Sequence, residues 1–478
     1  MGTVTDKLPG GTRVGHVMNA IRQRIAARQL VPGARLPSIR GFAAATRVSK
    51  STVVDAYDRL AAEGIIHSRP GAGFYVTGHI APLSLAEIGP RLERNVDPLW
   101  VSRQSLETGD DILKPGCGWL PSSWLPQDAL RRAMRASARA DDATLAAYAS
   151  PLGSPALRQL LARRIAERGI EASPDQILLT DSGTHAIDLL CRFLIEPGDA
   201  VLVDDPCYFN FQALLRAHRA RIISVPYTPN GPDVGLFAKA LEEHRPRLYI
   251  TNSGVHNPTG ATLTPVVAHR LLKLIEAHDL HVIEDDIFAD FEHEPAVRLA
   301  SFDGLNRVVQ IGSFSKTLSA SVRCGYIVAR PQWIEGLVDL RIATTFAGSR
   351  VSQEVVLAIL KDGSYRRHID TLRHRLTNAM RGTADRLAEM SITPWLRPQA
   401  GMPQAGMPRA GMFLWCRLPP GLGATELASQ ALAQGIVLAP GNVFSPTQSA
   451  NDLMRFNVSQ MTDPRIFRML AAATRSVR

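Results

Sequence analysis

The chain has 478 residues, of which 45% are hydrophobic and 21% charged, which is the composition of an ordinary globular protein with room for more than one domain. No apolar run reaches the roughly 18 residues that a membrane span needs, and the amino-terminal residues lack the apolar core of a signal peptide. The five cysteines are odd in number and never spaced as CxxC, so we expect a cytoplasmic location without disulfides or a zinc site.

The net charge of +10 is concentrated near the amino end. Residues 1–78 contain eleven Lys and Arg but only four Asp and Glu, a local excess of +7. Such a basic region is suited to binding a polyanion. Charge alone favours the other explanation, a solvated basic face.

Three helices are expected near the amino end. Apolar residues recur at helical spacing within 13–30, and Val-Pro-Gly at 31–33 ends that pattern. Ser38 can cap a second helix over 39–45, and Ser49 can cap a third. The few residues between the second and third helices leave space only for a tight turn.

The third helix should end at Gly64, and two short apolar strands then flank a basic tip at 69–73. Helix, helix, short turn, helix and hairpin together make a winged helix-turn-helix. In that architecture the amino-terminal end of the third helix contacts the major groove, and its polar residues here are Ser49, Lys50, Ser51 and Thr52.

The stretches LPSIR, VSKSTVVDAYDRLAAEGII and SRPGAGFYV closely resemble the GntR family of transcription regulators. The resemblance implies double-stranded DNA as a partner, with Arg35, Ser38 and Arg40 on phosphates and the third helix on bases. The wing, with Arg69 and Gly71, would reach an adjacent groove. Arginines and helix N-termini fix position on DNA, while short polar side chains on the third helix specify sequence.

Residues 79–112 show no sustained period and are interrupted by prolines, so we interpret them as a linker between a DNA-binding domain at 1–78 and a larger domain at 113–478. The larger domain alternates helical stretches with short apolar strands at 177–181, 200–206, 221–226, 247–252, 281–286, 307–313 and 324–329. This alternation predicts an α/β fold with a largely parallel sheet.

Polar motifs follow several of these strands, at the edge where open α/β sheets bind ligands. DSGTHAID at 181–188 should open a helix whose first N–H groups can face a phosphate. DDPCYF offers Tyr208 as a ring to cover a planar cofactor, although a core aromatic explains it equally well. HNPTG presents Asn257, and VIEDD presents Asp285, a carboxylate able to keep a pyridine nitrogen protonated.

Lys316 lies in SFSKTLSASVR, with Ser313 and Ser315 before it and Arg323 after it. An amine that forms an imine with an aldehyde, beside hydroxyls and a guanidinium that hold a phosphate, is the chemistry of a pyridoxal phosphate site. Taken alone, the motif fits a surface lysine in a polar loop equally well. The agreement of several motifs in one order favours the cofactor site.

These motifs resemble the fold type I pyridoxal phosphate enzymes, the aspartate-aminotransferase-like group, over residues 113–478. The resemblance implies a mixed, mostly parallel sheet with a smaller C-terminal subdomain. It implies Lys316 as the catalytic Schiff-base lysine, Asp285 on the pyridine nitrogen and Asn257 on the ring hydroxyl, with Tyr208 stacked on the ring. The phosphate contacts that it implies are Ser182, Gly183, Thr184, Ser313 and Arg323.

Tyr148 matches the tyrosine that reaches the phosphate of the partner subunit, so the resemblance implies a homodimer. Arg455 matches the arginine that binds a substrate carboxylate through a bidentate pair. One position departs from the group, because Ile287 and Phe288 stand where a tyrosine usually follows the aspartate. Cofactor binding should survive, since Asn257 remains, but a full transaminase rate is not expected.

A repeat interrupts the carboxyl-terminal part, where PQAGMPQAGMPRAGM at 398–412 contains three near-identical pentads. Only the last pentad, which leads into FLWCRL, fits the pattern of the aminotransferase-like group. The first two are interpreted as a duplicated loop with no assigned chemistry.

A GntR-type head joined to an aminotransferase-like body is the arrangement of the MocR (GabR-like) regulators, which this chain resembles from end to end. The resemblance implies a pyridoxal phosphate-dependent, DNA-binding transcription regulator that senses an amino compound through Schiff-base exchange at Lys316. Aminotransferase activity should be weak at most. Two alternatives stay open, namely a working aminotransferase with an accessory DNA-binding domain and a head that has become a protein-interaction module.

Overall fold

The computed structural model describes residues 12–26, 30, 33–69, 71–77, 106, 111–396, 408 and 410–475. The chain divides into two compact units, Met1–Arg94 and Asn95–Arg478, and the division falls within the predicted linker at 79–112. Most of that linker and the first two pentads of 398–412 lie outside the described residues. No helix in the described part of the chain is long and apolar enough to span a membrane.

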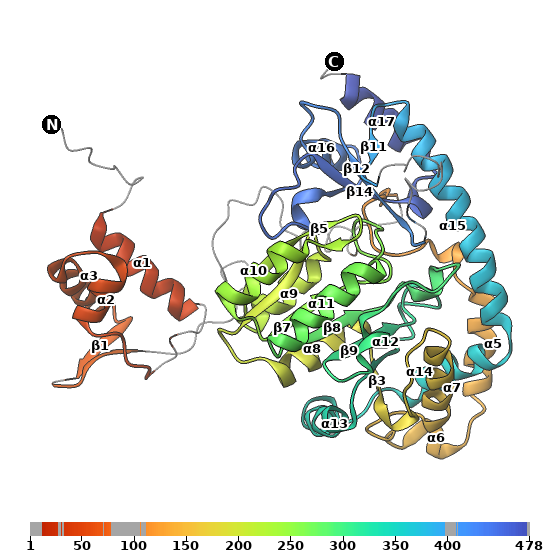
Figure 1. The fold of residues 1–478 in the computed structure, drawn as a ribbon, viewed down its shortest axis with the longest axis horizontal. Coiled ribbons are helices and arrows are strands. Elements are labelled where there is room, and N and C mark those ends of the chain that lie inside the picture. Colours follow the sequence, from red (N-terminus) through yellow and green to blue (C-terminus); the bar gives the residue numbers. More distant parts are fainter. Residues whose placement is uncertain are drawn as a thin grey trace. The chain divides into compact units, whose positions relative to one another are not determined.

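The smaller unit is a winged helix-turn-helix, as the sequence predicts (Figure 1). Ser38 accepts a hydrogen bond from the N–H of Gly41, and Ser49 accepts one from the N–H of Thr52, so both expected caps are present. The elements are α1 (Arg13–Ala26), α2 (Ile39–Thr46), α3 (Lys50–Ala62), and the antiparallel pair β1 (Ile66–Arg69) and β2 (Gly73–Val76).

Tyr57 lies at the centre of this unit and is fully buried. Its ring meets Phe42 of α2 and Phe74 of β2 edge-on, with centroids 6.1 and 5.1 Å away. Its hydroxyl donates to the carbonyl of Pro37 over 2.9 Å. One side chain of α3 therefore fixes both the second helix and the wing.

The larger unit is built on an eight-stranded sheet in the order β3-β10-β9-β8-β7-β4-β5-β6. The five central strands β9, β8, β7, β4 and β5 run parallel, whereas β10 is antiparallel to both its neighbours and β6 is antiparallel to β5. The strands are β3 (Ile177–Thr180), β4 (Ala200–Asp205), β5 (Arg221–Thr228), β6 (Gly231–Pro232), β7 (Leu248–Thr251), β8 (His281–Asp285), β9 (Val308–Ser313) and β10 (Gly325–Val328). This is the mixed, mostly parallel sheet that was expected.

Helices alternate with these strands and also pack at one end of the unit, where α14 contacts α5, α6 and α7 (Figure 1). The alternating helices are α8 (Gly183–Leu194), α9 (Phe209–Ala217), α10 (Val234–His244), α11 (Pro265–Ala277) and α12 (Leu299–Asp303). The helices at the end are α5 (Gln127–Ser137), α6 (Asp142–Ala146), α7 (Pro155–Ala166), α13 (Pro331–Thr345) and α14 (Arg350–Lys361), and the short turns are η1 (Ser122–Trp124), η2 (Pro174–Gln176) and η3 (Ala289–Phe291).

A smaller C-terminal subdomain contains a four-stranded antiparallel sheet in the order β11-β12-β14-β13. The 25-residue helix α15 (Ser364–Ala388) leads from α14 to this sheet (Figure 1). The remaining elements are β11 (Thr393–Pro394), β12 (Phe413–Arg417), α16 (Ala424–Leu432), β13 (Ala439–Pro440), η4 (Gly441–Val443), β14 (Leu453–Asn457), η5 (Val458–Gln460) and α17 (Pro464–Arg475).

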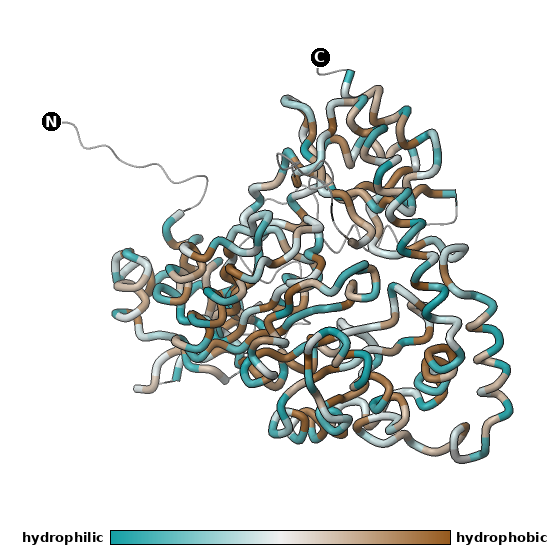
Figure 2. The backbone as a smooth tube through the Cα atoms, turned by 45° about the vertical axis from the view of Figure 1, so that its right-hand side comes forward, coloured by the Kyte–Doolittle hydropathy of each residue, from teal (hydrophilic) through white to brown (hydrophobic). Residues whose placement is uncertain are grey.

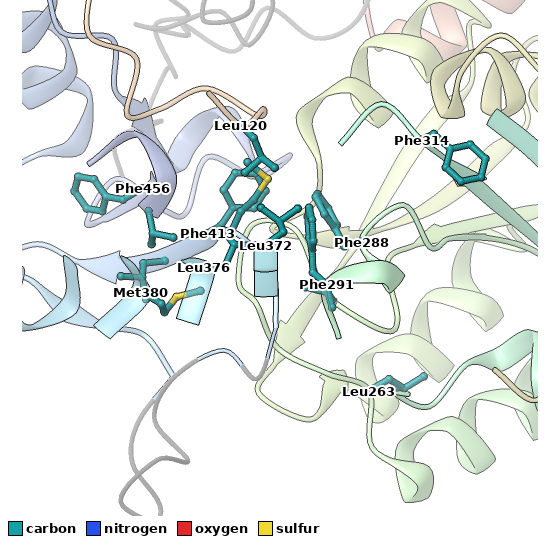
Figure 3. Close-up of a cluster of buried hydrophobic side chains, with 14 of the residues drawn as sticks. Leu120, Leu263, Phe288, Phe291, Phe314, Leu372, Leu376, Met380, Phe413 and Phe456 are labelled. Carbon is teal, nitrogen blue, oxygen red and sulfur yellow. The ribbon is translucent and has the colours of Figure 1, made fainter. Parts of the chain in front are cut away.

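Hydrophobic residues of the larger unit gather in its interior, as the colouring of the backbone shows (Figure 2). The largest of the three buried clusters in the described part of this unit continues from the main sheet into the C-terminal subdomain. There Leu372 of α15 and Phe413 of β12 lie beside Phe288, which follows β8 (Figure 3). The rings of Phe288 and Phe413 meet edge-on at 5.7 Å.

Candidate functional site

Lys316 lies in the turn after β9, and its ammonium group faces the interior. Its Nζ donates to the carbonyl of Gly118 over 2.8 Å. Burial lowers the pKa of Lys316 to about 8, while the Cys117 thiol, Arg455 and Asp285 act on it electrostatically. The amine is therefore neutral far more often than an ordinary lysine near neutral pH, which is the form that attacks a carbonyl.

Asp285 ends β8, and its side chain is also buried. One carboxylate oxygen accepts a hydrogen bond of 3.2 Å from the N–H of Ile287, and Asn252 donates to the Asp285 carbonyl over 3.0 Å. Burial raises the pKa of Asp285 to about 7. Among the described residues Asp285 forms no ion pair, so its carboxylate could still pair with a cationic group of a ligand.

Arg455 lies on β14 and is only 1% exposed. One terminal nitrogen donates to Asn257 Oδ1 over 3.0 Å and the other to the carbonyl of Gly116 over 2.8 Å. The guanidinium also lies over the rings of Phe413 and Phe444, 4.1 and 4.6 Å from their centroids. Burial lowers the pKa of Arg455 to about 10. These four neighbours are neutral, and among the described residues no carboxylate pairs with Arg455, so its buried charge is uncompensated there.

Helix α8 begins at Gly183 with Ser182 as its cap, and the Ser182 hydroxyl accepts from the N–H of His185 over 3.0 Å. The first N–H groups of a helix have no acceptor within it, so they can bind an anion. A methyl group added to Gly183 would lie 3.3 Å from Ile287 Cγ2 and 3.7 Å from Ser313 Cβ. The start of α8 is thus directly beside the ends of β8 and β9.

Hydroxyl groups extend this anion-binding corner. Ser313 Oγ lies 3.1 Å from Ser315 Oγ, and it also accepts a hydrogen bond of 3.2 Å from the N–H of Ser315. Thr184 and Arg323 are exposed, and the backbone of Arg323 has a positive φ of 51°. The predicted phosphate contacts therefore gather around the start of α8, with Arg323 in the turn between β9 and β10.

Tyr208 is brought into the same site, at the start of α9. Burial raises its pKa to about 12, with Arg455 opposing the shift and Asp285 adding to it. Tyr148, in contrast, is 80% exposed and stacks on Phe346 at 5.4 Å. Among the described residues of this chain, Tyr148 shows no contact with the site.

The sequence did not single out several groups that complete the site. The carbonyl of Gly116 accepts a hydrogen bond from Arg455, and the carbonyl of Gly118 accepts one from Lys316. Cys117 lies between these glycines in the sequence. Phe413 and Phe444 flank the guanidinium of Arg455. The string PGCG was the available signal, because closely spaced glycines often mark a backbone that a ligand or side chain approaches.

In the smaller unit the expected DNA contacts lie on the surface. The Ser49 hydroxyl is within 2.8 Å of the Ser51 hydroxyl and 2.7 Å of the Thr52 hydroxyl, so it is engaged in its own cap. Thr52 is half-buried, and the exposed residues are Arg35, Ser38, Arg40, Ser49, Lys50, Ser51, Arg69 and Gly71.

One of these basic residues belongs to the wing, and another lies beside it. Arg69 lies over the ring of Tyr75, 4.5 Å from its centroid. The backbone of Arg35 pairs with that of Tyr75 in an isolated antiparallel β-bridge, and a methyl group on Gly73 would lie 3.5 Å from Arg35 Nε. Arg35 is therefore placed beside the wing as well as before the second helix.

Comparison with known proteins agrees with both units. Residues 13–76 match the bacterial regulatory proteins of the gntR family, and residues 118–472 match the family described as aminotransferase class I and II. The chain belongs to the GntR-type regulators that carry an aminotransferase class I and II domain. The larger unit accordingly has the fold of pyridoxal phosphate-dependent aminotransferases.

Curated relatives are named as regulators. The chain is 29% identical over 448 residues to the uncharacterized HTH-type transcriptional regulator YdcR of Escherichia coli K12, covering 92% of this chain and 93% of the relative. It is 30% identical over 353 residues to the HTH-type transcriptional regulator NorG of Staphylococcus aureus USA300, covering 72% and 78%.

Solved structures resemble the larger unit. An archaeal alanine:glyoxylate aminotransferase superposes with a TM-score of 0.70 at 25% identity, covering 79% of this chain and 93% of that protein. LysN, the alpha-aminoadipate aminotransferase of Thermus thermophilus, gives a TM-score of 0.69 at 24% identity over 78% and 95%. That structure is a complex with N-(5'-phosphopyridoxyl)-L-leucine.

Proposed function

We propose that this regulator binds pyridoxal phosphate at Lys316 and uses it to sense an amino compound that carries a carboxylate. The observation that carries the proposal is the pairing of a buried, partly neutral Lys316 with an uncompensated Arg455 in one site. The amine of the effector would exchange with Lys316 on the cofactor, and its carboxylate would pair with Arg455.

The residues of the chain fit the cofactor. The start of α8, with the hydroxyls of Ser313 and Ser315, supplies neutral donors for a phosphate. Asp285 has no ion pair among the described residues, and a protonated pyridine nitrogen would give it one. Tyr208 offers a ring beside Asp285. When bound, pyridoxal phosphate supplies an aldehyde that condenses reversibly with amines.

The chain's own groups would act as follows. The Gly118 carbonyl orients the amine of Lys316, and burial keeps part of that amine unprotonated. Arg455 would exchange its neutral acceptors, Asn257 and Gly116, for the two oxygens of a carboxylate, which gives stronger charge-assisted bonds. Asn257 would then be free to bind the ring hydroxyl of the cofactor.

We also propose a homodimer, which is supported by exposed apolar side chains on neighbouring helices. Tyr148 and Phe346 stack on each other at the surface, and α14 packs against α5 and α6 beside them. The exposed residues of this face are Met134, Leu145, Tyr148, Ile342, Phe346 and Val351. Covering this apolar face would place Tyr148 against a second copy, where it could reach the partner's phosphate.

A dimer would carry two DNA-binding heads, so we expect an operator with two half-sites in the cytoplasmic DNA. Effector binding would change DNA affinity only if the effector binds two states of the dimer differently. Sensing therefore requires that the bound effector be held, and it does not require turnover.

The test is reductive trapping of the cofactor. Wild-type protein incubated with pyridoxal phosphate should absorb visible light, and borohydride should fix the label on Lys316, as read by peptide mass spectrometry. Lys316→Ala should lose both signals, while Lys273→Ala, at an exposed position on α11, should keep them. Labelling at a lysine other than Lys316 would overturn the assignment.

A further inference from the structure

The turn that carries Lys316 is bonded to the first two turns of α15. Thr317 is 1% exposed, and its Oγ1 lies 2.8 Å from the hydroxyl of Tyr365. His368 Nε2 lies 2.8 Å from the carbonyl of Thr317. Both the side chain and the backbone of the residue next to Lys316 are therefore held by one helix.

The hydroxyl of Tyr365 continues the chain of hydrogen bonds to the carboxylate of Asp290. Although burial opposes it, Arg168 and Arg164 hold the pKa of Asp290 below its usual range, so this carboxylate is an acceptor only. Tyr365 has one hydroxyl proton and gives it to Asp290. Thr317 must then donate to Tyr365, so the hydrogen bonds run in one direction, from Thr317 through Tyr365 to Asp290.

The ring of Tyr365 is held on two sides. The guanidinium carbon of Arg164 lies 4.9 Å from its centroid, and Phe314 meets it at 6.2 Å with the ring planes 77° apart. Phe314 comes two residues before Lys316. Tyr365 thus touches the lysine turn both before and after the lysine.

The far part of α15 packs against β11, β12 and η5 of the C-terminal subdomain. Leu372, Leu376 and Met380 of this helix lie among the side chains of that interface, beside Phe413 (Figure 3). Phe413 in turn lies under the guanidinium of Arg455 at 4.1 Å. A single helix therefore connects the lysine turn with the strand pair that carries the arginine.

We propose that Thr317 and Tyr365 are positioning residues for Lys316. Their hydrogen bond ties the lysine turn to α15 and thereby holds the amine at the Gly118 carbonyl. The inference rests on the proposed function only in taking Lys316 as the functional lysine. Loss of the bond would let the lysine turn move away from α15 and let water reach the amine. The fold would remain, because the apolar contacts of α15 do not depend on it.

The experiment measures the pKa of Lys316 in the cofactor-free full-length protein, by competitive labelling across neutral and alkaline pH with mass spectrometry. Thr317→Val removes the hydroxyl at constant shape, and Tyr365→Phe removes its partner. Each should raise the pKa of Lys316 towards the ordinary lysine value by about 0.5 to 1 unit, the worth of one hydrogen bond. The charged groups that face the amine, Arg455 and Asp285, and the Cys117 thiol stay in place.

Two controls separate positioning from general destabilisation. Thr317→Ser keeps the hydroxyl and should titrate like wild type. Thr371 lies on the same helix, and its hydroxyl donates to the Arg367 carbonyl over 2.9 Å. Thr371→Val should therefore leave the pKa of Lys316 unchanged. Thermal melting of each variant reports stability separately from the pKa.

The proposal is wrong if Thr317→Val leaves the pKa of Lys316 at its wild-type value, or if Thr317→Ser shifts it equally. It is also wrong if wild-type Lys316 titrates as an ordinary lysine. Should Tyr365→Phe fail to fold, Thr317→Val decides alone. Because the labelling uses no cofactor, a failure of pyridoxal phosphate to bind Lys316 would overturn the proposed function and leave this inference standing.

Discussion

Asp285→Asn provides a direct test of the electrostatics of the site. The carboxylate is 4% exposed and forms no ion pair among the described residues, and burial raises its pKa to about 7. Asparagine keeps the shape of the side chain and removes the charge. We expect the variant to be more stable than wild type when both lack cofactor and the pH is alkaline.

The pKa shift gives the magnitude. The pKa rises from 3.8 to about 7. At 1.36 kcal/mol per unit, this corresponds to about 4 kcal/mol in the free energy of unfolding. A raised pKa means that the folded state holds the proton more tightly, so the contribution of Asp285 to wild-type stability is greatest below the ordinary aspartate pKa. It falls as the pH rises to about 7, and the asparagine variant lacks this fall.

The assay is denaturant unfolding of the cofactor-free protein in acid and in mildly alkaline buffer. The two proteins should be similarly stable in acid, and the variant should be more stable by up to about 4 kcal/mol in alkali. Asp128→Asn, at an exposed position on α5, should show no such difference. A variant that is less stable than wild type at both pH values would refute the reasoning.

Three further predictions follow from the surfaces and cations described. Arg455→Lys should keep the cofactor but require about tenfold more effector for the spectral change, because one charge-assisted bond is lost; an unchanged requirement would exclude Arg455 from effector binding. Arg40→Ala should weaken binding to all DNA sequences and reduce the salt slope by about one, whereas Arg59→Ala, whose guanidinium is 2.8 Å from Asp55, should not. Phe346→Asp should yield a monomer in sedimentation, and a persistent dimer would place the interface elsewhere.

Seven of the eight strands of the main sheet could be predicted within one or two residues, because buried strands are continuous apolar runs, whereas the two-residue strand β6 was not predicted. β4 was expected at 200–206 and is Ala200–Asp205. The strands of the C-terminal subdomain were not predicted. β13, for example, has two residues, Ala439 and Pro440, and a two-residue strand has no period to detect.

Site residues with side-chain chemistry were predicted because they follow the strand ends that meet at one edge of the sheet. Lys316, Asp285 and Asn257 belong to this group. The carbonyl of Gly118 could not be predicted, since a backbone acceptor has no sequence signature and lies 198 residues from Lys316. The same holds for Phe413, whose place under Arg455 looks in the sequence like any core aromatic.

Phe288 bears on whether the site senses or catalyses. It is 3% exposed, and its ring meets Phe413 edge-on at 5.7 Å beside Leu372 (Figure 3). A tyrosine there would bring a hydroxyl that needs a polar partner, whereas phenylalanine seals the loop after Asp285 against the C-terminal subdomain.

The loop that follows Asp285 therefore packs against the subdomain that carries Arg455, and it does not offer a further hydroxyl to the ligand. An enzyme gains from groups that act on the reacting molecule, while a sensor gains from contacts that make two arrangements of its parts differ in effector affinity. We propose that the apolar contact between Phe288 and Phe413 is of the second kind. Rapid turnover of an amino donor, with DNA affinity unaffected by that donor, would show that this contact serves stability alone.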